Sequence, residues 1–269
     1  MTRSTPLYLD PCTLYLFYPS MSTPHQPLPS THGYCNHCKT EHSLSSDKAQ
    51  KICLKLMQIL DEKKRIDFTV SNHQADPRFS TEYLFGEARG KMFGVLVCKD
   101  LDDSEHILQS FSGQYNGIWE ADGWAPPLFN TNILHNISQD VEKKIKELGR
   151  KIKLQNPNSK KKSALIKERK SLSQNLMKDI HALYIVSNFS GDSKPLETVY
   201  IGSGIPTGTG DCCAPKLLNY AAQHNLTPVS LAEFYWGKEN LSGTRKHGKF
   251  YSSCLDKCQP ILGYMLCGL

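Results

Sequence analysis

Hydrophobic positions along the chain alternate between a helical spacing and short compact runs. Residues 45–64 place Ile52, Leu56 and Ile59 or Leu60 on one face, and Ser45 or Ser46 stands ahead of them as a possible N-cap, so this stretch predicts a helix. The apolar runs at 91–100 and 106–113 are separated by a polar turn. Together they predict a β-hairpin.

The segment from 138 to 187 returns to helical spacing over a much longer distance. Two apolar stripes are interrupted by a polar stretch that contains Pro157, which cannot lie inside either helix. The stripes predict an antiparallel helical hairpin packed like a coiled coil. Their residues are Val141, Ile145, Leu148 and Ile152, followed by Leu165, Leu172, Leu176, Ile180 and Leu183.

Beyond the hairpin, the pattern predicts a helix at 212–225, a strand at 227–237 and a short helix at 252–269. Without the 138–187 insertion, the order of elements is α-β-β-α-β-α. We therefore expect an α/β fold in which residues 45–269 form one domain. Residues 1–44 precede it as a proline-rich lead that ends in a Cys-x-x-Cys segment.

Composition narrows the class of protein. The 269 residues are 39% hydrophobic and contain no apolar run long enough to cross a bilayer. The opening residues make a poor signal peptide, and residues 1–20 show no periodicity, so Met21 is an alternative start. We expect a cytoplasmic protein that does not act in a membrane.

Positive charge is concentrated in the expected hairpin. Residues 140–180 hold thirteen Lys and Arg against five Asp and Glu, a net charge of +8, whereas the whole chain carries +6. Such localisation favours contact with RNA phosphates, although a solvated helix face is the simpler alternative. The candidate RNA-binding residues are Lys151, Lys153, Lys160, Lys161, Lys162, Lys167, Arg169 and Lys170.

Six of the ten cysteines form three clusters, at 35–38, 212–213 and 254–258. In a cytosolic chain, paired cysteines indicate metal ligation more often than disulfides. Cys35 and Cys38, with His42 or alternatively His37 as a third ligand, form a candidate zinc knuckle and second metal site. Three alternatives remain open: this pair could join Cys254 and Cys258, could hold a metal with His42 and Cys53, or could be free thiols.

The order of elements resembles the zinc-dependent nucleoside and nucleic-acid deaminase fold, a three-layer core with ligands at the starts of two helices. On this resemblance, Cys213 and Ala214 match the first ligand motif, and Cys254 and Cys258 match the second. The resemblance implies zinc held by Cys213, Cys254 and Cys258. Pro215 stands where the family has its proton-transferring Glu, so we expect no deaminase activity.

A second resemblance covers residues 83–269 and rests on "GTGDCCAPKLLNYA", "LAEFYWG" and "CLDKCQPILGYML". These stretches are similar to the accessory N-terminal region of some RluA-type RNA pseudouridine synthases. The resemblance implies an association with RNA modification, and with a separate pseudouridine synthase or a ribosome-associated protein as partner. No stretch of the synthase's catalytic type occurs in this chain.

The sequence therefore predicts a zinc-containing accessory protein that associates with RNA. As an alternative, the chain is an enzyme acting on a nucleobase or small molecule, with Cys212, Asp211 or His247 as candidate catalytic residues. A third interpretation is a module that docks a partner protein through the hairpin.

Overall fold

A four-stranded antiparallel sheet forms the centre of the protein. The computed structural model describes residues 30–269, so Met21 and the rest of residues 1–29 of the proline-rich lead lie outside the described residues. The strands lie in the order β4 (Glu105–Phe111), β3 (Lys91–Lys99), β7 (Thr227–Trp236) and β8 (Lys249–Tyr251). The protein thus combines helices with antiparallel sheets, which agrees with the expected α/β class in its general outline.

Helices cover both faces of this sheet. Side chains of β3 alternate: Phe93, Val95 and Val97 pack in the cluster that includes α1 (Asp47–Lys63), on one face. Leu96 and Cys98 point to the opposite face, toward α5 (Cys213–Gln223). Because both of its faces are covered, β3 is a continuous apolar run rather than an alternating one.

The approach of α5 to the sheet depends on Gly94 of β3. A Cβ at this position would lie 2.6 Å from Cys213 Cβ, closer than real side-chain contacts allow. The glycine thus brings the N-terminus of α5 directly onto the sheet. This close contact fixes where the cysteines at that helix end lie.

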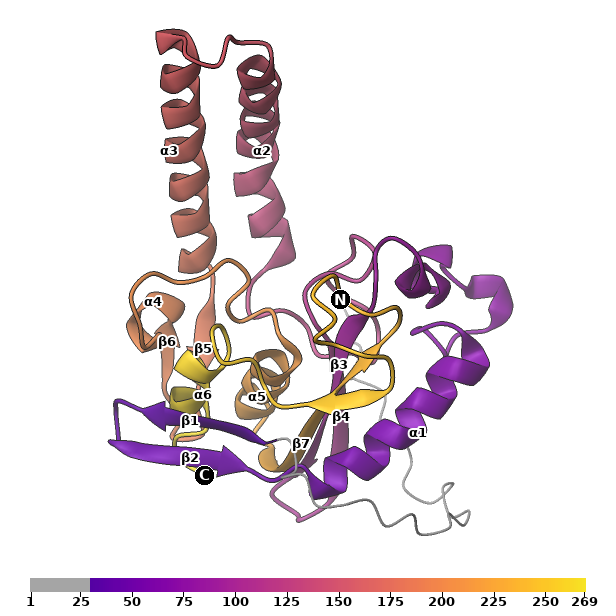
Figure 1. Ribbon diagram of the computed structural model, residues 1–269. Helices are drawn as coiled ribbons and strands as arrows, with labels where there is room; N and C mark the ends of the chain where they lie inside the picture. Colours follow the sequence, from indigo (N-terminus) through magenta and orange to yellow (C-terminus); the bar gives the residue numbers. More distant parts are fainter. Residues whose placement is uncertain (1–29) are drawn as a thin grey trace.

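Two further pieces pack beside the core at the left of Figure 1. The strands β1 (Thr31–Cys35) and β2 (Thr40–Leu44) form an antiparallel hairpin, and α6 (Gln259–Met265) packs on β1. Gly263 of α6 lies so close to this hairpin that a Cβ would meet the carbonyl oxygen of Tyr34 at 2.1 Å. The N-terminal and C-terminal ends of the described chain are therefore packed together.

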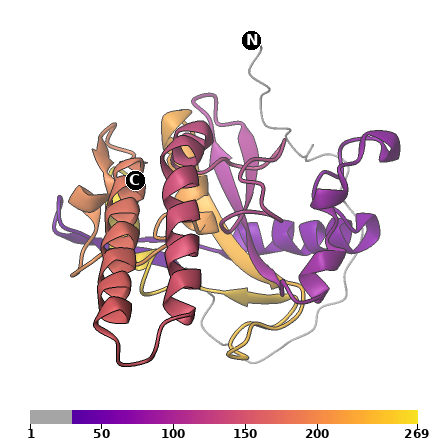
Figure 2. The ribbon, with the colours of Figure 1, turned by 90° about the horizontal axis from the view of Figure 1, so that it is seen from above.

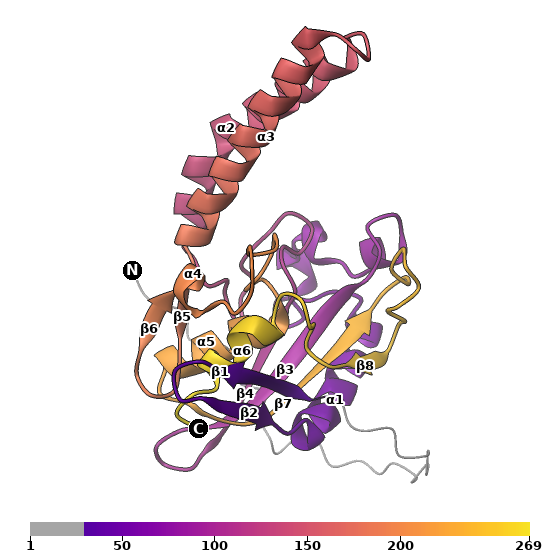
Figure 3. The ribbon, with the colours of Figure 1, turned by 60° about the vertical axis from the view of Figure 1, so that its left-hand side comes forward.

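Two long helices inserted between β4 and α5 project from the core as an arm. Helices α2 (Thr131–Lys153) and α3 (Lys160–Ala182) run antiparallel, as Figures 1 and 3 show, and Figure 2 shows them side by side from above. The helix α2 begins seven residues before the expected 138, because the Asn130 side chain accepts hydrogen bonds from the first turn. Leu148 and Leu176, from the two predicted stripes, are buried between the helices.

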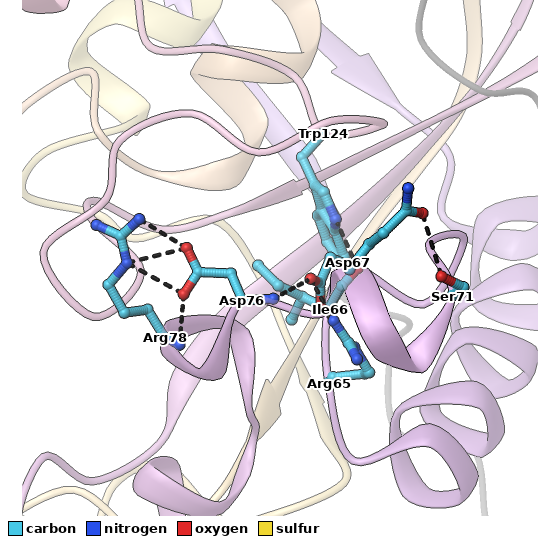
Figure 4. A network of polar contacts seen from close by, with 8 residues as sticks. Arg65, Ile66, Asp67, Ser71, Asp76, Arg78 and Trp124 are labelled. Atoms are coloured by element: carbon cyan, nitrogen blue, oxygen red, sulfur yellow. Dashed lines mark hydrogen bonds and ion pairs between the residues drawn. The ribbon is translucent and has the colours of Figure 1, made fainter.

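The connection from α1 to β3 is held by polar contacts (Figure 4). It contains three short 3-10 helices: η2 (Asn72–Gln74), η3 (Pro77–Phe79) and η4 (Glu82–Phe85). Asp67 pairs with Arg65 and accepts from the Asp76 amide, and Asp76 pairs with Arg78. Trp124 donates to the Ile66 carbonyl at 3.1 Å, which attaches the aromatic loop 114–130 to this connection.

Several short elements were not predicted from the sequence. They are β1, β2, β8, and the group β5 (Ile185–Ser187), β6 (Ser193–Pro195) and α4 (Leu196–Val199). Each is too short for a periodic signal, and pairing between segments defines them. Among the described residues, no helix combines the length and apolar character needed to cross a membrane.

Candidate metal centre

Three thiols meet where two segments of the core end side by side. Cys212 is the N-cap of α5, and Cys258 is the N-cap of α6. The sulfur of Cys254 lies 3.9 Å from that of Cys212 and 3.3 Å from that of Cys258. All three sulfurs lie within 4.8 Å of one another, a spacing that fits a single metal ion.

The turn before α6 brings Cys254 and Cys258 onto the same side. The Cys258 amide donates to the Cys254 carbonyl at 3.2 Å, which closes one helical turn ahead of the helix. We expected the pair inside the first turn of a helix spanning 252–269. In the structure α6 begins only at Gln259, so the pair lies just before it.

The three thiols influence one another's protonation. Hydrogen bonding from Cys212 and Cys258 lowers the pKa of Cys254, whereas the bond to Cys254 raises the pKa of Cys212. The pKa of Cys258 is raised, first by its contact with Cys212. The cluster thus favours a thiolate at Cys254, and a thiolate is the form of cysteine that binds metals.

Cys213, the ligand expected from the resemblance, lies away from this cluster. Its side chain is fully buried, its Sγ donates to the Met92 carbonyl at 3.3 Å, and burial raises its pKa. Consecutive residues at a helix start point about 100° apart, so when Cys213 faces the sheet, Cys212 faces the other thiols. The structure therefore differs from the expectation by one residue.

A buried carboxyl group connects the two segments that carry the cysteines. Glu233 on β7 accepts from the Ala214 amide at 2.9 Å and from the Ser253 hydroxyl at 3.1 Å. Burial raises the pKa of Glu233 to about 7, against the lowering effect of these two donors. A carboxyl with this pKa can both accept and donate a proton near neutral pH.

Among residues 30–269, no fourth Cys, His, Asp or Glu completes the cluster of Cys212, Cys254 and Cys258. Three protein ligands with an open position characterise catalytic zinc sites, whereas structural sites have four. Pro215 lies buried in the first turn of α5 and offers no group for proton transfer. Glu233, unlike Pro215, has an acidic side chain, and it is hydrogen-bonded to both segments that carry the cysteines.

The other two candidate catalytic residues lie elsewhere. Asp211 lines a cavity of about 430 Å³ at the base of the arm, beside His135 and His181. It accepts a hydrogen bond from the Tyr184 hydroxyl at 2.7 Å, and burial raises its pKa.

His247 packs against Trp236, with ring centroids 4.2 Å apart, and accepts a hydrogen bond from the Gly237 amide. Neither residue belongs to the thiol cluster.

A second group with metal-binding geometry lies at the N-terminal hairpin. Cys35, Cys38 and His42 come together there, as the sequence suggested, and Cys267 joins them from the far end of the chain. Cys53, one of the alternatives considered, lies on the buried face of α1 and donates to the Ala232 carbonyl instead. Cys267 carried no signal, because in sequence it is a lone cysteine in an apolar stretch.

The candidate RNA-binding residues all lie on the arm. They occupy the end of α2, the beginning of α3 and the turn of helix that follows, far from the core in Figure 3. Of the eight, Lys162 is half-buried and the other seven are exposed.

Comparison of the chain with protein-family models, with curated proteins and with solved structures finds no match.

Proposed function

We propose that the protein is a metal-containing RNA-binding module that holds RNA phosphates on the distal half of its arm. The observation that carries this proposal is the distribution of charge along the arm. Residues 150–170 hold nine Lys and Arg against one Glu, a net charge of +8, whereas the rest of 140–180 sums to zero. The excess positive charge therefore lies entirely at the end remote from the core.

Ion pairs sharpen this contrast. On the proximal part of α2, Lys143 pairs with Asp140 and Lys146 pairs with Glu142. In the distal half, Lys151 pairs with Glu147. The remaining distal cations among the described residues have no acidic partner: Arg150, Lys153, Lys160, Lys161, Lys162, Lys167, Arg169 and Lys170. Cations without partners on an exposed arm suit contact with phosphates, which release bound counterions when they bind.

In this proposal the core is a deaminase-like scaffold with zinc at Cys212, Cys254 and Cys258. Three features support a deaminase-like scaffold: the order of elements, the helices on both faces of the sheet, and the thiols at the starts of two helices. Soft thiolates suit zinc, and binding would join the start of α5 to the turn before α6. The motifs similar to the accessory region of RluA-type synthases suggest that a separate synthase acts on the same RNA.

The test is the salt dependence of RNA binding. Substituting Lys160, Lys161 and Lys162 by Glu should weaken binding to a structured RNA hairpin. It should also flatten the plot of log affinity against log salt by about 0.9 for each phosphate that the variant no longer neutralises. Negative charge in the first turn of α3 is favourable to the helix dipole, so the arm should stay folded.

The matched control replaces Lys48, Lys51 and Lys55 on α1 by Glu, which changes the net charge equally but away from the arm. Its salt slope should equal that of the wild type. An arm variant with an unchanged slope contradicts the proposal, and absence of RNA binding by the wild type favours a protein partner on the arm instead.

A second candidate function, hydrolytic deamination of a nucleobase, is favoured by the three-thiol cluster and by Glu233, which is hydrogen-bonded to both segments that carry it. Bound zinc would supply an activated water. Glu233, already hydrogen-bonded to both ligand segments, would carry the proton between water and base. Ammonia release from cytidine or adenosine tests this, and Glu233→Gln should lower the rate about 10²–10⁴-fold while zinc content stays the same. No release by the zinc-loaded wild type eliminates this candidate.

A further inference from the structure

The second group of metal-binding geometry has a complete set of four donors. The sulfurs of Cys35, Cys38 and Cys267 and a ring nitrogen of His42 all lie within 4.8 Å of one another. In a tetrahedral zinc site with Zn–S bonds of about 2.3 Å, the sulfurs lie about 3.8 Å apart. The four side chains therefore need only small adjustments to surround one ion.

The β1–β2 hairpin presents three of these donors from one end. The turn between the strands is closed by a hydrogen bond from the Lys39 amide to the Cys35 carbonyl, 2.9 Å. Lys39 takes a left-handed conformation, with φ of 59°. Cys35 is paired across the hairpin with Thr40, and His42 follows Thr40 by two residues on the same strand. The Nε2 atom of His42 lies 3.0 Å from the Sγ atom of Cys38. The turn and the second strand thus bring two thiols and an imidazole together.

The fourth donor is held in place independently of the hairpin. Cys267 follows α6, and its carbonyl accepts from the Phe189 amide at 2.9 Å. Its thiol is buried, as is that of Cys35, whereas Cys38 is exposed. The group therefore combines a buried sulfur from the segment after α6 with an exposed sulfur from the hairpin turn, and it lies at the edge of the protein.

We propose that Cys35, Cys38, His42 and Cys267 bind a structural zinc ion that fastens the N-terminal hairpin to the C-terminal end of the chain. Three thiolates and one imidazole fill the tetrahedral shell and leave no position for water or substrate, which is the pattern of structural sites. The ion would join residues more than 220 positions apart in sequence. This site is independent of the RNA-binding arm and of the Cys212 cluster.

The contacts around the site show what the ion would hold. The hairpin lies against α6 through the close approach of Gly263 to Tyr34. At its other end, Gln259 Nε2 lies 2.7 Å from His32 Nε2, and the hydroxyls of Thr31 and Ser253 lie 3.3 Å apart. A two-stranded hairpin alone is marginal in water, so a metal at its turn is a direct way to keep it docked.

The test is zinc content, measured by elemental analysis on protein purified without chelator. Cys38→Ser should hold one zinc ion fewer per chain than the wild type, and cobalt(II) added to its zinc-free form should give correspondingly weaker thiolate absorption. Because Cys38 is exposed, its substitution would otherwise change little. The variant should also show weaker hydrogen-exchange protection in residues 31–44.

His37→Ala is the matched control, since His37 is exposed in the same turn but is not one of the four donors. It should keep the zinc content of the wild type. Cys267→Ser should give the same decrease as Cys38→Ser, and RNA affinity should stay the same in all three variants. Wild-type zinc content in Cys38→Ser, or an equal decrease in His37→Ala, would overturn the proposal.

Discussion

At the scale of single residues, the core contains charged groups in places that water does not reach. Lys216 on α5 is 1% exposed, and its Nζ donates to the carbonyls of Phe111 and Gly113 at 3.0 and 2.9 Å. The same ammonium lies 4.8 Å from the centre of the Phe111 ring. These contacts tie α5 to the end of β4, but burial still lowers the pKa of Lys216 to about 8.

Lys216 should make stability depend on pH in the alkaline range. In the unfolded chain its pKa is near the ordinary 10.5, above the folded value of about 8. Between these values the unfolded state binds more protons, so the free energy of unfolding rises with pH. Relative to Lys216→Met, the wild type should gain up to about 3 kcal/mol from pH 8 to 10.5. Urea unfolding of both proteins at several pH values measures this difference, and a constant difference would contradict it.

At the scale of elements, the start of α5 decides which cysteine does what. Gly94 lets the helix sit directly on β3, and the side of α5 that faces the sheet takes Cys213 into the core. The preceding residue, Cys212, then points toward the turn that carries Cys254 and Cys258. The division of roles between two adjacent, chemically identical residues is thus a consequence of helix orientation.

Substituting each of the paired cysteines separately should show this division. Cys212→Ser should abolish zinc binding at that cluster, because only two thiols remain for the metal. Cys213→Ser should keep the zinc and lower the free energy of unfolding by about 1–3 kcal/mol, because a hydroxyl replaces a buried thiol. Zinc content and thermal unfolding of the two variants check both statements. Loss of zinc in Cys213→Ser with retention in Cys212→Ser would contradict the geometry.

At the scale of the whole molecule, charge and metal-binding geometry are separated in space. The arm segment 140–180 carries +8, and the rest of the chain sums to −2. Both cysteine groups lie outside the arm, one between the starts of α5 and α6 and the other at the edge of the protein, where β1–β2 meets the C-terminal end. An RNA bound to the distal arm would therefore not contact either cysteine group. Substitutions can remove a cysteine group without changing the arm surface, and substitutions on the arm leave both cysteine groups unchanged.

Elements whose signal is local could be predicted from the amino-acid sequence. The spacing of apolar residues identified α1, β3, β4 and β7, and Pro157 together with the lysines marked the turn and charge of the arm. These signals are readable because a helix or strand that covers a core must repeat its apolar side with a fixed period. Cys35, Cys38 and His42 were also readable, because their donors are close in sequence.

Contacts between residues distant in sequence depend on how the elements pack, and the sequence pattern did not predict them. Cys267 lies beside Cys35 because α6 packs on β1. Cys212, rather than Cys213, lies beside Cys254 because α5 packs directly on Gly94. Glu233 on β7 accepts hydrogen bonds from both segments that carry the cysteines. In each case the side chain's role depends on a direction set by packing against another element. A period along one segment carries no information about that direction, since the partner lies tens or hundreds of residues away.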